Sequence, residues 1–114
     1  MSRSVLLQLA RDSIQEVLEA QRTINKNELL TQHPLLSQTI TTQVNIYIDQ
    51  KLKSTYKAEQ LALIDAIIIA SKRAGFESQD GFILTTSAYL HCEIELVLET
   101  EEGVISERDP AIIS

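Results

Sequence analysis

The sequence predicts an α+β fold, with a small, mostly antiparallel sheet and helices packed on one of its faces. Apolar residues recur at helical spacing over 4–19, and the largely apolar stretch 57–74 is longer than a normal strand. They alternate with polar residues, as in half-buried strands, over 40–48 and 90–98. The expected order of helix, strand, strand, helix and strand is typical of α+β proteins. Because the chain has no Pro-rich or Gly/Ser-rich stretch, residues 1–114 are expected to form a single domain.

The first helix is expected over residues 4–19, with one apolar and one polar face. The apolar face comprises Leu6, Leu9, Ala10, Ile14, Val17 and Leu18, and the polar face comprises Arg11, Asp12, Gln15, Glu16 and Glu19. A short helical turn could start with Asn27 as its cap. The pair His33-Pro34 should end it, because a residue before proline avoids helical geometry.

A β-hairpin is expected next. In 40–48, Ile40, Thr42, Val44, Ile46 and Ile48 should face inward, and Thr41, Gln43, Asn45 and Tyr47 outward. The loop is predicted at 49–51 and the return strand at 52–56. No Asn-Gly or Asp-Gly pair marks the turn.

The second helix is expected over 57–74, with Gly75 just past its end. A polar loop, 77–81, should follow. In the strand predicted over 90–98, Leu90, Cys92, Ile94, Leu96 and Leu98 should point inward and His91, Glu93 and Glu95 outward. Residues 101–103 should form a turn and Val104 should begin another strand, which Asp109-Pro110 would end.

The composition is that of a small acidic protein, with a net charge of −6 and a pI of about 4.8. This charge disfavours unspecific binding to nucleic acids or anionic membranes, since both require a basic surface. The single cysteine excludes an intrachain disulfide, and the sequence predicts a cytoplasmic protein. Bases gather in the middle of the chain and acids towards its end, so these two regions could pair within one chain or between subunits.

The best candidate for ligand binding is the predicted hairpin end, where Lys53, Thr55, Tyr56 and Lys57 occur together. Basic side chains beside a tyrosine could hold a phosphate or an acidic partner. The alternative is an ordinary hairpin end, in which lysines protect an exposed strand edge from unwanted pairing.

Other candidate residues have structural explanations. His91, Glu93 and Glu95 share one flat strand face and do not converge as metal ligands should, so no metal site is expected. Cys92 should be a small apolar residue of the core. His33, near Ser37 and Thr39, lacks the other parts of a catalytic triad. No nucleotide-binding motif occurs, and no cofactor is expected.

Asp65 interrupts the apolar second helix, and two explanations are open. It could be buried and paired with Lys53 or Arg73, or it could mark a narrow solvated stripe together with Lys72. In the second case, Ile68 and Ile69 beside the stripe could be covered in a homodimer.

The sequence resembles the start of the AMMECR-one domain family. Leu7 to Leu18 is similar to the family's opening helix, with its leucine, alanine and arginine followed by an isoleucine. Val44 to Ile48 lies where the family has its first core strand, and Ala66 to Ala74, Phe82 and Cys92 to Leu98 follow its later helix, loop and strand. The resemblance covers only the first part of the usual family domain.

The chain departs from the family at its signature, a leucine-arginine-glycine-cysteine-isoleucine-glycine motif after the first hairpin turn. The best match is Leu52 to Lys57, which keeps the leucine and a basic residue but loses both glycines and the cysteine. The family's aspartate-proline-arginine-phenylalanine segment is reduced to Asp80-Gly81-Phe82. The resemblance implies partners such as a Memo-type protein or a radical-SAM enzyme, which accompany bacterial members.

These observations favour a non-catalytic binding or accessory domain. The first alternative is a divergent enzyme with a site near Lys53–Lys57 and the loop before Phe82. The second is an RNA-binding domain, because the order of elements is similar to that of K-homology domains. The Gly-x-x-Gly loop of those domains is absent, however, and the net charge opposes RNA binding.

Overall fold

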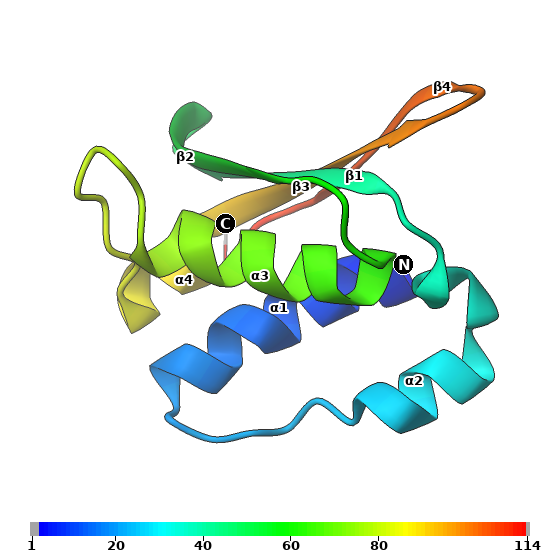
Figure 1. Ribbon diagram of the computed structural model, residues 1–114. Helices are drawn as coiled ribbons and strands as arrows, with labels where there is room; N and C mark the ends of the chain where they lie inside the picture. The colour runs from blue at the N-terminus through cyan, green and yellow to red at the C-terminus, as the bar shows by residue number, and fades with distance from the viewer. Residues whose placement is uncertain (1–2, 114) are drawn as a thin grey trace.

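The computed structural model describes residues 3–113 and confirms the α+β fold (Figure 1). Its elements are α1 (Val5–Leu18), α2 (Lys26–Gln32), the short 3-10 helix η1 (Pro34–Ser37), β1 (Thr41–Ile48), β2 (Lys51–Ala58), α3 (Leu63–Phe76), α4 (Thr86–His91), β3 (Cys92–Thr100) and β4 (Gly103–Asp109). All helices lie on one side of the sheet in Figure 1. No helix within 3–113 has the length and apolar character needed to cross a bilayer.

The sheet has four antiparallel strands in the order β2-β1-β3-β4. The central strands β1 and β3 are neighbours in space although α3 and α4 separate them in the chain. β2 and β4 are therefore the two edges. One face of the sheet, called the helix side, packs on the helices. The other, called the open side, carries Gln43, Asn45, Tyr47 and Glu95.

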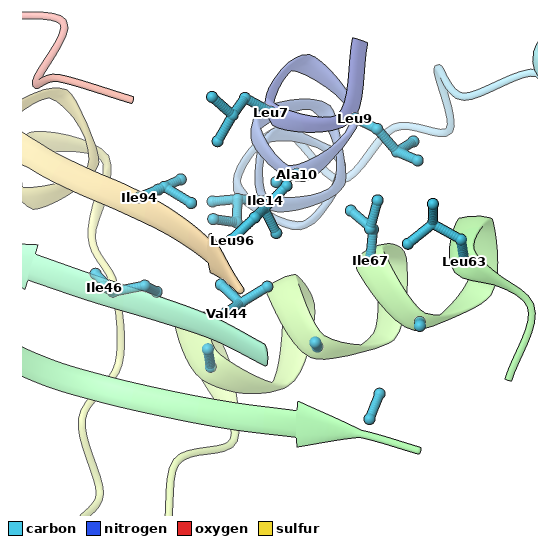
Figure 2. Packing of buried hydrophobic residues seen from close by; sticks show 14 of the residues in the cluster. Leu7, Leu9, Ala10, Ile14, Val44, Ile46, Leu63, Ile67, Ile94 and Leu96 are labelled. Carbon is cyan, nitrogen blue, oxygen red and sulfur yellow. The ribbon is translucent and has the colours of Figure 1, made fainter. Parts of the chain in front are cut away.

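The core lies between the helix side of the sheet and helices α1 and α3 (Figure 2). Val44 and Ile46 of β1 and Ile94 of β3 are fully buried there. They face Ile14 of α1 and Ile67 of α3, which are also fully buried. The predicted inward pattern of these strands is therefore confirmed at its central positions.

Helix α1 begins one residue after Ser4, whose side chain accepts a hydrogen bond from the backbone N–H of Leu7 at 3.2 Å. The prediction that Arg11 lies on the solvent face is wrong, because Arg11 is fully buried. Val17, which was assigned to the core, is 42% exposed. The buried stripe is rotated towards Leu7 and Arg11, since the C-terminal segment supplies acceptors that allow an arginine to be buried.

The start of helix α2 also differs from the prediction. Asn25, not Asn27, caps the helix, and its side chain accepts a hydrogen bond from the N–H of Glu28 at 3.1 Å. The helix ends before His33, as predicted, and Pro34 opens η1. Proline suits this first helical position because its missing N–H would have no partner there.

The β1–β2 hairpin turns through only two residues, Asp49 and Gln50, so the predicted three-residue loop is one residue too long. Both have positive φ, 52° and 64°, as two-residue type I′ turns require. Strand β2 then runs from Lys51 to Ala58, longer than predicted. Its register shifts beside Ile46, which leaves Lys53 without a partner on β1 as the extra residue of a β-bulge.

Helix α3 begins at Leu63, so the prediction of helix from Lys57 is wrong for its first six residues. Lys57 and Ala58 pair with β1 instead, because cross-strand pairing outweighs the weak helix propensity of a few residues. Gly75 lies inside the helix, which ends at Phe76. A hydrogen bond from the N–H of Leu63 to the carbonyl of Gln38, at 2.7 Å, fixes the start of α3.

The strand predicted from Leu90 starts later, at Cys92, because Leu90 and His91 belong to helix α4. Thr85 caps this helix by accepting a hydrogen bond from the N–H of Ala88 at 3.1 Å. His91 therefore does not share a strand face with Glu93 and Glu95. The predicted last strand is confirmed as β4 and ends at Asp109.

Candidate functional site

A groove of about 650 Å³ follows the outer edge of β2, and all four predicted binding residues line it. These are Lys53, Thr55, Tyr56 and Lys57. The opposite wall is formed by Arg73 near the end of α3 and by the following loop, residues 77–80. In Figure 1 this loop projects beside the end of the sheet that holds the β1–β2 turn.

The alternation of β2 explains why side chains from both faces reach one groove. Thr55 pairs with Asn45 and Lys57 with Gln43, which places them on the open side. Tyr56 pairs with Val44 and so lies on the helix side. Because β2 is an edge strand, nothing within residues 3–113 separates these two faces at its outer border.

On the open side, hydrogen bonds hold the groove residues in place. The Thr55 hydroxyl donates to Asn45 Oδ1 at 2.6 Å, and Asn45 Nδ2 donates to Glu95 Oε1 at 2.9 Å. Lys57 Nζ lies 3.0 Å from a carboxylate oxygen of Glu99. This hydrogen bond raises the pKa of Lys57, so its side chain is a cation at neutral pH.

On the helix side, Arg73 and Tyr56 form the second part of the lining. Arg73 Nη1 donates to the Tyr56 hydroxyl oxygen at 2.6 Å, and the guanidinium carbon lies 5.3 Å from the ring centroid. Beneath them, Ser54 Oγ donates to the carbonyl of Ala74 at 2.5 Å and ties β2 to α3. The position of Arg73 is therefore fixed relative to the strand edge.

The loop after α3 is ordered by its own hydrogen bonds. Ser78 Oγ accepts from the N–H of Phe82 at 2.9 Å, and the Ser78 carbonyl accepts from the N–H of Gly81 at 3.2 Å. Gly81 has φ of +77°, a conformation that favours glycine. The N–H of Leu84 donates to the carbonyl of Gly75 at 2.8 Å, which anchors the far end of the loop.

This arrangement presents donors to an anion. Lys53, Lys57 and Arg73 supply charged N–H groups, and Tyr56 adds a hydroxyl donor, since its oxygen accepts from Arg73 and its proton stays free. Lys53 is exposed and makes no ion pair within residues 3–113. The described lining contains no histidine or cysteine, the usual proton-transfer or nucleophilic groups.

The other candidate residues are dispersed. His91 Nδ1 lies 3.0 Å from the carbonyl oxygen of Ile113, at the far end of β3 from Glu99. Glu95 accepts hydrogen bonds from Asn45 and Tyr47. Within the described chain, 3–113, no group of three or more His, Cys, Asp or Glu side chains is arranged to hold a metal ion.

Cys92 is fully buried, which confirms its predicted place in the core, and burial raises the pKa of its thiol. Asp65 pairs at 2.6 Å with Lys26, not with Lys53 or Arg73 as the first explanation required. Its side chain is 38% exposed, as a solvated stripe predicts. His33 is half-buried, and the hydroxyl of Ser37 donates to the carbonyl of Pro34 rather than to His33.

Sequence reasoning missed Arg73 as part of the groove and offers it only as a partner for Asp65. Arg73 carries no local signal for binding, because it reaches the groove through the packing of α3 on β2. The loop before Phe82 was named only for the divergent enzyme, and its residues 77–80 do line the groove beside Lys53–Lys57. The bulge at Lys53 was missed as well.

Comparisons with known proteins identify the fold. No family model matches the sequence, and no curated protein matches it. Among solved structures, the chain is similar to the uncharacterised protein PH0010 from Pyrococcus horikoshii, with a TM-score of 0.71 and 17% sequence identity. The match covers 82% of this chain and 48% of PH0010, so the chain spans about half the length of that protein. At this identity the similarity concerns the fold alone.

Proposed function

We propose that this chain is a non-catalytic binding or accessory domain, related to the AMMECR-one family, which binds an anionic ligand in the groove beside β2. The observation that supports this proposal is the meeting of Lys53, Thr55, Tyr56 and Lys57 with Arg73 at one strand edge. Three of these five residues are cations, and Tyr56 adds a hydroxyl donor, whereas the hydroxyl proton of Thr55 is donated to Asn45.

The charge of the whole chain makes this groove distinctive. The chain carries a net charge of −6, so its overall field repels polyanions. An anionic ligand must therefore be recognised by local contacts. An arginine whose guanidinium is already oriented by Tyr56 supplies such a contact with little loss of side-chain freedom.

Binding without catalysis is supported by the composition of the lining. The acids of the described lining are Glu77 and Asp80, and neither has a histidine or cysteine beside it in the lining. The segment Leu52–Lys57 also lacks the glycines and cysteine of the family signature. By resemblance, a Memo-type protein or a radical-SAM enzyme is the proposed kind of partner.

The test compares two double variants with the same change in charge. In the groove, Lys53→Glu and Lys57→Glu replace one base without an ion pair and one with an exposed partner, Glu99. The control carries Arg22→Glu and Lys26→Glu and changes the charge by the same amount. Arg22 lies in the loop before α2, and Lys26, in the first turn of α2, has the exposed partner Asp65.

The probes are inorganic pyrophosphate and hexaglutamate, titrated into isotope-labelled protein and followed by NMR. We expect amide shifts around Thr55 and Arg73, and affinity about tenfold or more weaker in the groove variant than in the control, as the loss of charged hydrogen bonds implies. Equal affinity in both variants, or shifts confined to other surfaces, would overturn the proposal. Circular dichroism establishes that both variants are folded.

A further inference from the structure

The outer edge of β2 has the form of a strand-pairing site. β2 pairs with β1 on one side only, and within residues 3–113 no strand lies on its other side. From Ser54 to Ala58 its register with β1 is regular, so its outward N–H and C=O groups follow at even spacing. Such an edge can accept an additional strand through main-chain hydrogen bonds.

Charge distinguishes this edge from the other. Between Lys51 and Ala58, β2 contains three lysines and no acid. The opposite edge strand, β4, contains Glu107, Arg108 and Asp109, the last of which is buried and paired with Arg3 and Arg11, and it follows the exposed pair Glu101 and Glu102. A basic edge favours a partner strand with acidic side chains, because opposite charges on neighbouring strands attract and like charges repel.

We propose that an acidic, extended segment of a partner protein adds to the sheet along β2 as a fifth strand. The inference rests on the proposed function and specifies its ligand. Main-chain pairing with Ser54–Ala58 would hold the segment, and the groove would receive its side chains.

The groove also predicts the pattern of the segment. Side chains that point to the open side would meet Thr55 and Lys57. Those that point to the helix side would meet Tyr56 and a wall of mixed charge, formed by Arg73, Glu77 and Asp80. Acids should therefore occupy every second position, on the open side, with uncharged residues between them.

A second copy of the chain fits this edge less well. Pairing of β2 with β2 would bring the lysines of two subunits together. Pairing of β2 with β4 of the next copy would join opposite edges of the sheet, an arrangement that repeats without closing unless rotation forms a ring. A different protein chain is the occupant that the charges favour.

The test uses heptapeptides of alternating glutamate and valine, capped at both ends. The first is unmodified, the second is N-methylated at all its valines and the third at all its glutamates. All have the same charge, but each modified peptide lacks the N–H donors of one of its two edges, because alternate residues of a strand direct these groups to opposite sides. Binding is measured by calorimetry, and slowed hydrogen exchange of β2 amides by NMR.

For strand addition, we expect one modified peptide to bind about tenfold or more weaker than the unmodified one, and the other to keep its affinity. Slower exchange should appear at alternate amides of β2. Equal binding of all three peptides would mean attraction by charge alone and would overturn the inference. Slowed exchange at β2 without peptide, rising with protein concentration, would assign the edge to a second copy and would also overturn it.

The outcomes separate this inference from the proposed function. If pyrophosphate binds in the groove but the three peptides bind alike, strand addition is wrong and the anion-binding function stands. If neither pyrophosphate nor any acidic peptide binds at Lys53 and Lys57, both are wrong. The Lys53→Glu, Lys57→Glu variant should weaken the unmodified heptapeptide, and the Arg22→Glu, Lys26→Glu control should not.

Discussion

Three clusters within residues 3–113 combine an arginine with a tyrosine, and two of them, around Arg11 and Arg73, differ in burial. Around Arg11, the guanidinium is fully buried, with Nε 2.6 Å from Asp109 Oδ2 and Nη2 3.0 Å from the carbonyls of both Cys92 and Pro110. Its carbon lies 5.1 Å from the centroid of the Tyr89 ring. At the β2 groove, Arg73 is exposed to solvent and donates to the hydroxyl oxygen of the half-buried Tyr56.

The comparison shows how burial separates a structural cluster from a binding surface. The groups around Arg11 come from α1, α4, β3, the last residue of β4 and Pro110 after it, so the cluster fastens the C-terminal segment to the first helix. Its donors are directed at protein acceptors. The groove leaves Lys53 exposed and Arg73 with donors directed at solvent, so only the groove can exchange water for a ligand.

The largest expected effect tests the buried cluster. Arg11→Met should lower the free energy of unfolding by about 3 kcal/mol, the low end for a broken buried ion pair, because Asp109 keeps Arg3 as a partner at 3.0 Å but two carbonyls lose their donor. Urea denaturation measures the change. The control Arg22→Met, at an exposed site, should stay within about 0.5 kcal/mol. Equal stability of the two variants would contradict a structural role for Arg11.

A smaller loss of stability is expected at Glu16, which is intermediate in burial between Arg11 and Arg73. Its carboxylate accepts hydrogen bonds from Lys72 Nζ at 2.8 Å and from the N–H groups of Thr23 and Ile24 at 2.7 and 2.8 Å. Burial alone would raise the pKa of Glu16, but these bonds outweigh it and lower the pKa below 4.5. The stabilisation is thus present above about pH 4.5 and is lost as the pH falls through the lowered value.

Glu16→Gln should therefore cost about 1–2 kcal/mol at neutral pH, the lower part of the range for hydrogen bonds to a charged group, since Lys72 is partly solvated. The difference between wild type and variant should shrink below pH 4.5 in urea titrations. A difference independent of pH would show that the charge of Glu16 contributes nothing. Glu19→Gln, at an exposed position, is the control.

The smallest effect is expected at the hairpin beside the groove, and its sign is opposite. Gln50 has φ of +64°, which a residue with a Cβ adopts at a cost. Gln50→Gly should raise the free energy of unfolding by about 0.5–1 kcal/mol, because glycine adopts this turn freely. Thermal unfolding measures it. Lower stability would show that the side chain of Gln50 contributes more than the turn conformation costs.

Much of the fold follows from local patterns. The alternation around Val44 and Ile46 fixes which face of β1 is buried, and the apolar spacing over α1 and α3 predicts two helices on that face. The limits of the elements depend on more distant contacts. Helix α4 is six residues long and has no amphipathic period to reveal it, and β2 extends to Ala58 because β1 lies beside it.

For the candidate site, the sequence by itself determined which residues of β2 could bind an anion, since Lys53, Thr55, Tyr56 and Lys57 are neighbours in the chain. The tertiary structure decided what surrounds them. It placed Arg73 across the groove from them, because α3 packs on the helix side of β2. In the sequence, most of α3 separates Arg73 even from Lys57, the closest of the four residues.

Arg11 illustrates the same division. Its helical position beside Ala10 was evident from the sequence, but its burial was not. An arginine enters a protein interior only where acceptors converge on it, and here Asp109, Cys92 and Pro110 lie at the other end of the chain. Short-range spacing thus specifies helices, strands and their apolar faces. Whether a charged side chain is buried or exposed depends on partners that only folding brings together.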